Sequence, residues 1–122
     1  MKILIIDDDE QMRVLLRQVM EWSGYEVFEA ADGRAGMLKQ RKEQADLVIT
    51  DLIMPEQEGL ETITGLKKEY PELKIIAISG GGRIGPDAYL PAAQELGADR
   101  VFSKPFDVRE LANTVKELLA HG

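Results

Sequence analysis

The chain has 122 residues, of which 44% are hydrophobic and 30% are charged; this fits one compact domain and excludes two. The net charge of -7 excludes the basic footprint of a nucleic-acid-binding surface, so we expect no direct nucleic-acid binding. Because the chain has no cysteine, no signal peptide and no long apolar span, we expect a soluble cytoplasmic protein with no disulfide, no thiolate metal site and no membrane contact.

The first half of the chain alternates between strand-like and helical patterns. Residues 3–6 form the apolar run ILII, and a pattern with apolar side chains at three- and four-residue spacing follows it. Ser23-Gly24 is expected to end this helix. A polar-interrupted strand is predicted at 25–30 and a short helix at 35–41.

The second half continues the alternation with three further strand–helix pairs. The strands are predicted at 47–50, 75–78 and 100–103, and the helices at 60–70, 87–96 and 108–119. Pro71 is expected to terminate the first of these helices. The chain therefore predicts five strand–helix units in succession.

Strict alternation of strands and helices predicts a doubly wound α/β domain, a (βα)5 flavodoxin-like three-layer sandwich around a parallel five-stranded sheet. The first, third and fourth strands are continuous apolar runs, which is typical of central strands, whereas the second and fifth carry polar residues and belong at the edges. The order 2-1-3-4-5 satisfies this pattern and puts the ligand-binding switch point between strands 1 and 3. We expect residues 1–122 to be this single domain, with no output domain.

Polar side chains stand at the ends of four of the predicted strands. Asp7 and Asp8 follow the first strand, Asp51 the third, Ser79 the fourth and Lys104 the fifth. Because the carboxyl ends of parallel strands meet at one edge of the sheet, we expect three carboxylates, a hydroxyl and an ammonium to lie together there.

Each of these residues has a simpler interpretation when it is taken alone. An acidic run before a helix usually caps it, and Asp9 and Glu10 are assigned no more than that. Ser79 alone would be a turn residue, and Lys104 alone a solvated charge. Their joint placement at four strand ends is what favours a functional site.

The single histidine and the aromatic residues are assigned no chemistry. His121 lies at the end of the chain. Trp22, Phe28 and Phe106 are interpreted as packing residues rather than ligand contacts.

The predicted cluster needs a cation. Carboxylates about 4 Å apart repel each other by roughly 4 kcal/mol per pair at an effective dielectric constant near 20. Oxygen-only ligands with open positions favour Mg²⁺, with Mn²⁺ as a substitute. An Asp beside such an ion, a Lys and a Ser hydroxyl is equipped to attack phosphorus, and Asp51 is the expected nucleophile.

Four stretches, ILIIDDDE, LVITDLIMPEQEGLE, IIAIS and GADRVFSKPF, resemble the receiver domain of two-component response regulators, and the resemblance covers essentially the whole chain. It implies that Asp51 accepts a phosphoryl group from a sensor histidine kinase or a phosphotransfer protein, in a Mg²⁺-dependent reaction that gives 4-aspartylphosphate. Such a domain is a phosphoacceptor and not a turnover enzyme. Lys104-Pro105 is similar to the family's cis peptide.

The resemblance also implies a role for each site residue. Asp8 would bind Mg²⁺ directly, Asp7 mainly through water, and the main-chain carbonyl of Ile53 would complete the metal site together with the acceptor Asp. Ser79 and Lys104 would each bond a phosphoryl oxygen. The phosphorylated domain would switch a surface near the fourth helix and fifth strand, to be read by a downstream effector protein or output domain, as a monomer or as a phosphorylation-dependent homodimer.

The chain departs from the receiver pattern at three places. Val101 stands where receivers usually carry an aromatic, and strand alternation points the neighbouring Phe102 to the opposite face. The stretch 79–90, SGGGRIGPDAYL, is longer and richer in glycine than usual. We expect this loop and the helix after it to be the element that phosphorylation switches. Ile53 and Gly81 stand where side chains often orient the hydrolytic water, which predicts slow dephosphorylation.

Three other functions fit parts of the pattern. A pseudo-receiver would bind partners without phosphorylation, although the complete site argues against it. A haloacid dehalogenase-type phosphatase would use the D-x-D formed by Asp7 and Asp9 and would show steady turnover, but it leaves Asp51 without a role. A flavodoxin-like binding module would be yellow when purified, but the loop after the first strand is acidic where a flavin phosphate needs backbone amides.

Overall fold

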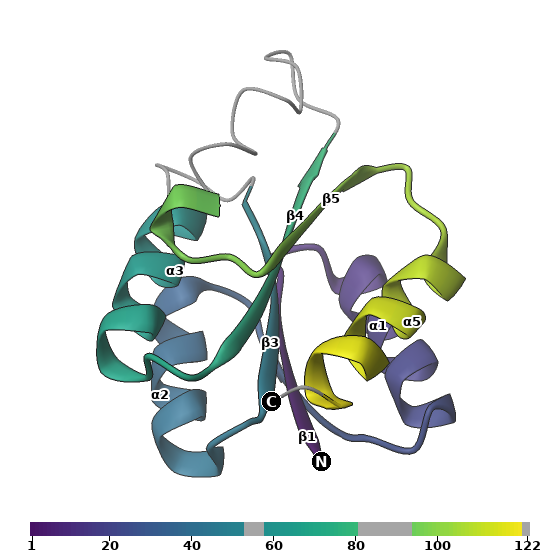
Figure 1. The fold of residues 1–122 in the computed structure, drawn as a ribbon, viewed down its shortest axis with the longest axis horizontal. Coiled ribbons are helices and arrows are strands. Elements are labelled where there is room, and N and C mark those ends of the chain that lie inside the picture. Colours follow the sequence, from purple (N-terminus) through teal and green to yellow (C-terminus); the bar gives the residue numbers. More distant parts are fainter. Residues whose placement is uncertain (53–57, 81–93, 121–122) are drawn as a thin grey trace.

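The structure is a computed structural model that describes residues 1–52, 58–80 and 94–120 (Figure 1). The strands are β1 (Lys2–Ile6), β2 (Glu26–Ala30), β3 (Leu47–Asp51), β4 (Lys74–Gly80) and β5 (Arg100–Lys104). The helices are α1 (Glu10–Trp22), α2 (Gly33–Glu43), α3 (Glu58–Glu69) and α5 (Val108–Ala120). Most of the helix predicted at 87–96 lies outside the described residues, and its last part, 94–96, is helical.

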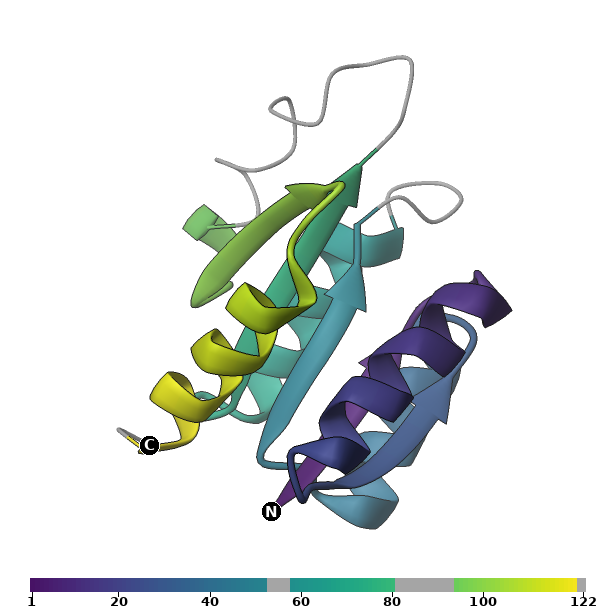
Figure 2. The ribbon, with the colours of Figure 1, turned by 90° about the vertical axis from the view of Figure 1, so that its right-hand side faces the viewer.

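The strands form one parallel sheet in the order β2-β1-β3-β4-β5, which confirms the predicted order and both predicted edges. Helices α2 and α3 cover one face of this sheet and α1 and α5 cover the other (Figures 1 and 2). The molecule thus has the predicted doubly wound, flavodoxin-like three-layer fold. Within the described ranges, no helix is long and apolar enough to cross a membrane.

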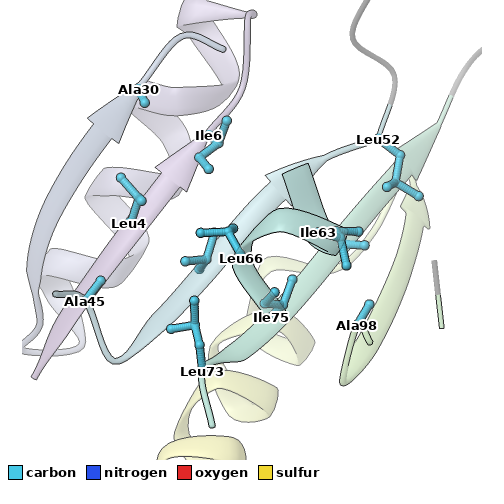
Figure 3. Close-up of a cluster of buried hydrophobic side chains, with 12 residues drawn as sticks. Leu4, Ile6, Ala30, Ala45, Leu52, Ile63, Leu66, Leu73, Ile75 and Ala98 are labelled. Carbon is cyan, nitrogen blue, oxygen red and sulfur yellow. The ribbon is translucent and has the colours of Figure 1, made fainter. Parts of the chain in front are cut away.

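Each face of the sheet has its own hydrophobic core, made by alternate residues of the central strands. The core under α2 and α3 is shown in Figure 3, where aliphatic side chains of β1 and β4 meet those of α3. Its members with no exposed surface include Leu4, Ile6, Val48, Ile63, Leu66 and Ile75. The core on the opposite face joins the sheet to α1 and α5 through Ile3, Ile5, Leu16, Met20, Leu111 and Val115.

The ends of α1 are fixed by the residues that the sequence indicates. The Asp9 carboxylate accepts hydrogen bonds from the backbone N–H groups of Gln11, at 2.9 Å, and Met12, at 3.4 Å. Asp9 is therefore the N-cap, as predicted. Ser23 is the C-cap, and Gly24 has a φ of 93°, a conformation that favours glycine.

Helix α2 begins two residues earlier than predicted and ends two residues later. The Asp32 carboxylate accepts a 2.7 Å hydrogen bond from the Ala35 N–H and so starts the helix at Gly33. At its other end, Gln44 adopts a left-handed conformation with a φ of 53°. The capping residues, rather than the apolar spacing, set these limits.

The aromatic residues differ in how they pack. Phe28 and Phe106 are partly buried against the two cores, and Phe106 makes an edge-to-face contact with Phe102 at 5.9 Å between centroids. The interpretation of Trp22 as a packing residue is wrong, because its side chain is 86% exposed. Trp22 lies seven residues after Leu15, two helical turns along the same outward side of α1.

The two neighbouring residues of β5 point to opposite faces of the sheet. Val101 packs against the core under α2 and α3, whereas Phe102 packs against the core under α1 and α5. This confirms the prediction that Phe102 points to the face opposite that of Val101.

Gly36 allows α2 to lie close to β1, and its replacement by Ala is expected to destabilise the protein by about 1–2 kcal/mol. A Cβ at this position would overlap Cδ1 of the buried Ile6 and lie 2.8 Å from its Cγ1. Overpacking costs about 1–3 kcal/mol, and the better helix propensity of Ala offsets up to about 1 kcal/mol of that. Urea unfolding of the variant measures the difference.

Gly65→Ala is the matched control for Gly36→Ala. Gly65 is also helical, in α3, but among the residues that the structure describes its added Cβ would meet only Met37, at an ordinary 3.7 Å. This variant should gain up to about 1 kcal/mol from helix propensity. Equal stability of the two variants would show that the contact between α2 and β1 is not tight.

Candidate functional site

The registers of the sheet bring the acidic residues of β1 and β3 to the same edge. Ile6 pairs with Thr50 across these two strands, so Asp7 and Asp51 follow side by side at their carboxyl ends. Asp8 comes next in the turn that leads into α1. This is the edge at which doubly wound folds bind their ligands.

Asp7, Asp8 and Asp51 form one carboxylate cluster. One carboxylate oxygen from each residue lies within 4.8 Å of those from the other two. Asp7 is 1% exposed and Asp51 is 4% exposed, whereas Asp8 is open to solvent. The predicted clustering of the three carboxylates is confirmed, and the cluster opens to solvent on the side of Asp8.

Lys104 brings a positive charge to the buried acid of β3. Its Nζ lies 3.4 Å from Oδ2 of Asp51, and its side chain is 25% exposed. The Lys104-Pro105 peptide bond is cis, as the resemblance implies. Because Asp51 is almost fully buried, this ion pair is screened by solvent much less than one on the surface.

Ser79 is fully buried near the carboxyl end of β4, one position before the residue that pairs with Lys104 in β5. It therefore comes to the same edge of the sheet as the acidic cluster. Ile53 and Gly81, which the sequence places beside the acceptor and the hydroxyl, lie outside the described residues, as does most of the 79–90 loop.

The two carboxylate oxygens of Asp7 have different surroundings. Oδ1 accepts a 2.9 Å hydrogen bond from the Asp9 N–H. Oδ2 is buried, and no group in the described ranges donates a hydrogen bond to it. A buried acceptor without a donor is costly unless a proton or a cation satisfies it.

Burial is the main reason why the pKa of the Asp7 carboxyl rises from its ordinary 3.8 to about 7. The charge of Asp51 also raises this pKa, and so does the proton that the two carboxyls can share, whereas the Asp9 N–H and the Lys104 ammonium lower it. The cluster therefore holds a proton near neutral pH when no cation is bound. Oxygen donors, an unsatisfied buried oxygen and an open side fit a small hard cation such as Mg²⁺.

Arg13 also contacts this site, although the sequence pattern assigned it no role. Its Nη1 donates a 2.7 Å hydrogen bond to the main-chain carbonyl of Asp7, and its Nε donates to Oε1 of Glu29 at 3.3 Å. The sequence feature that could have identified Arg13 is its position, a long basic side chain one turn into the helix that follows the acidic run. The spacing alone does not show which way that side chain extends.

An apolar hollow of about 400 Å³ lies beside Lys104, between the start of α1 and the segment that joins β5 to α5. Its lining residues are Met12, Leu15, Lys104, Pro105, Phe106 and Val108. Only Lys104 is charged among them. The hollow thus brings apolar surface next to the ion pair of the site.

Comparisons with known proteins agree with this arrangement. The chain is 35% identical to the sporulation initiation phosphotransferase F of Bacillus subtilis, over 97% of this chain and 93% of that protein. It is 33% identical to the transcriptional regulatory protein PhoP of the same organism, but it spans only 48% of that protein.

Solved structures show the same fold over almost the entire chain. The receiver domain of NtrX from Brucella abortus superimposes with a TM-score of 0.89 at 27% identity, covering 98% of this chain and 99% of that one. A CheY-like receiver domain protein from Methanospirillum hungatei gives 0.87 at 32% identity, covering 98% of this chain and 94% of that one. The family model described as the response regulator receiver domain matches residues 3–116. The chain therefore belongs to the response regulator receiver domain family.

Proposed function

We propose that the chain is a phosphoacceptor signalling domain in which Asp51 receives a phosphoryl group from a phosphohistidine. The observation that carries this proposal is a buried Asp51 held between an ammonium 3.4 Å away and two further carboxylates. An Asp51 oxygen attacks phosphorus, the new P–O bond forms as the P–N bond breaks, and the electron pair leaves on the imidazole nitrogen. The domain is changed by this reaction and does not turn over substrate.

Asp7, Asp8 and Asp51, with the main-chain carbonyl of Ile53, are the residues that would hold Mg²⁺, or Mn²⁺ in its place. The fit is supported by the oxygen-only donors and by the unsatisfied Oδ2 of Asp7. When bound, the ion neutralises charge on the phosphoryl oxygens during transfer. Asp8 is the exposed member of this carboxylate cluster, so an ion held there would be reached from the side of Asp8.

Lys104 and Ser79 are proposed to bind the other phosphoryl oxygens. Lys104 already pairs with Oδ2 of Asp51. Its side chain is partly exposed, so the ammonium has room to move toward a phosphoryl oxygen once Asp51 is phosphorylated. Ser79 has the right position in the sheet to offer a hydroxyl at the end of β4. Charge-assisted hydrogen bonds of this kind contribute about 1.5–3 kcal/mol each. Two of them are enough to shift the equilibrium between two conformations of the surface.

The partners of this domain are proposed from the same geometry. The phosphodonor is a sensor histidine kinase or a phosphotransfer protein, and it would cover the apolar hollow beside Lys104 as it approaches Asp51. The family and the phosphotransferase named among the relatives support a role in phosphoryl relay. A downstream effector protein or output domain would read the phosphorylated surface, with residues 1–122 as a single receiver, either monomeric or a phosphorylation-dependent homodimer.

The proposed function is tested by intact mass after incubation with acetyl phosphate, with Mg²⁺ and with a chelator. We expect a gain of one phosphoryl group per chain that requires Mg²⁺. No gain from acetyl phosphate or from a phosphohistidine-bearing donor would contradict the proposal and favour a pseudo-receiver. Continuous release of phosphate without a phosphorylated intermediate would favour a phosphatase.

Slow loss of the phosphoryl group is a further expected result. Ile53 and Gly81 offer no side-chain donor or acceptor to orient the attacking water. The decay of the phosphorylated mass after removal of the donor measures the half-life. Replacing Ile53 by Asn should shorten it, and an equally fast decay in the parent would contradict this explanation.

A further inference from the structure

We infer that Arg13 is a positioning residue of the proposed metal site, acting through the main chain of Asp7. The inference rests on the proposed Mg²⁺-dependent function. It concerns a side chain that contacts the Asp7 carbonyl and Glu29 and is not one of the proposed metal ligands. Its role would be to hold the turn that presents the carboxylates of Asp7 and Asp8.

Both backbone polar groups of Asp7 have partners, and Arg13 supplies one of them. The Asp7 N–H donates to the Ala30 carbonyl in β2 at 3.1 Å, which continues the sheet. Its carbonyl accepts the 2.7 Å hydrogen bond from Nη1 of Arg13. Asp7 is thus the residue at which the chain leaves the sheet, and a charged donor fixes that point.

Glu29 holds the Arg13 guanidinium in place from the neighbouring strand. Its Oε1 accepts from Nε of Arg13 at 3.3 Å, while its Oε2 accepts from Nη1 of Arg17 at 2.6 Å. The Arg13 side chain is only 17% exposed, compared with 42% for Arg17. Arg13 therefore joins α1, β2 and the end of β1 through one partly buried side chain.

The Asp7 main chain sets the direction of its carboxylate. Oδ1 is tied to the Asp9 N–H two residues later, which leaves Oδ2 as the buried acceptor without a donor. If the hydrogen bond from Arg13 to the Asp7 carbonyl is lost, the backbone of the turn through Asp8 and Asp9 gains conformational freedom. Metal binding must then order this turn again, which lowers the affinity. A residue that does not bind the metal but hydrogen-bonds the side chain of a metal ligand typically raises metal affinity about 10–100-fold.

Arg17 provides a matched control. It lies one turn further along α1 and also pairs with Glu29, but its hydrogen bonds go to Glu29 and Glu21 and not to Asp7. Arg13→Met and Arg17→Met each remove an arginine that bonds Glu29. Only the first removes the hydrogen bond to the Asp7 carbonyl.

The experiment compares Mg²⁺ dissociation constants of the parent, Arg13→Met and Arg17→Met, measured by isothermal titration calorimetry without a phosphodonor. We expect Arg13→Met to weaken Mg²⁺ binding by about tenfold, the lower end of the range for residues that orient a metal ligand. The Mg²⁺ affinity of Arg17→Met should stay within about twofold of the parent. Arg13→Lys, which keeps one donor, should recover part of the loss. Thermal unfolding without metal shows whether each variant is folded, and the Arg13→Lys and Arg17→Lys pair replaces the Met pair if Arg13→Met does not fold.

Amide hydrogen exchange of the metal-free proteins gives a second readout. The Asp9 N–H, which bonds Asp7, should exchange faster in Arg13→Met than in Arg17→Met. Equal Mg²⁺ affinities and equal Asp9 exchange in the two variants would overturn the inference and leave the proposed function intact. Failure of the parent to bind Mg²⁺ would instead contradict the proposed function itself.

Discussion

The Asp51→Asn variant is expected to take up no phosphoryl group from acetyl phosphate under conditions in which the parent gains one. An amide has almost the same shape as the carboxylate, but it lacks the anionic oxygen that attacks phosphorus. The neighbouring Lys104 ammonium, 3.4 Å from Oδ2 in the parent, cannot supply a nucleophile in its place. Intact mass over time measures the loss, which should be complete at the detection limit.

Asp9→Asn is the control for this loss. Asp9 belongs to the same acidic run but caps α1 through its carboxylate, and Asn caps helices as well as Asp does. The variant should therefore fold and take up a phosphoryl group like the parent. Uptake by Asp51→Asn at the parental rate, or its loss in Asp9→Asn, would contradict the assignment of the acceptor.

The metal-free protein is expected to lose stability as the pH rises through about 7, because of Asp7. Its folded-state pKa of about 7 lies above the ordinary 3.8, so the folded chain holds this proton more tightly than the unfolded chain does. The contribution is therefore present at low pH and disappears when the buried carboxyl ionises. Between pH 5 and pH 8 it amounts to about 2–3 kcal/mol, measured by urea unfolding with a chelator present.

Asp7→Asn separates this effect from the titration of all other groups. Asn stays neutral at every pH, so the variant should gain about 2–3 kcal/mol of stability relative to the parent between pH 5 and pH 8, and it should be the more stable of the two near pH 8. Saturating Mg²⁺ should reduce this difference at pH 8, because cation binding favours the ionised carboxylate of the parent. A stability difference between the two proteins that does not change with pH would show that Asp7 titrates normally.

The fold could be predicted because its signals are local and repeated. The uninterrupted runs ILII, LVIT and IIAI identify the central strands, and the polar residues of the other two strands place those strands at the edges. The site followed from the fold, because parallel strands bring Asp7, Asp51 and Lys104 to one edge whatever their distance in sequence.

Other features depend on contacts that periodicity does not determine. The guanidinium of Arg13 lies at the end of a long side chain, and its direction is set by Glu29 and the Asp7 carbonyl. The high pKa of Asp7 results from burial, which spacing does not measure. The interpretation of Trp22 as a packing residue fails because its position along α1 turns the side chain outward.

Locating the phosphoryl group tests most directly whether Asp51 is the acceptor. After incubation with acetyl phosphate and Mg²⁺, borohydride reduction converts an aspartyl phosphate to homoserine, which tandem mass spectrometry of peptides then places in the sequence. Homoserine is expected at position 51 and at no other carboxylate of the cluster. Homoserine at position 7 or 8, or a phosphoryl group that resists reduction because it is on Ser79, would contradict it.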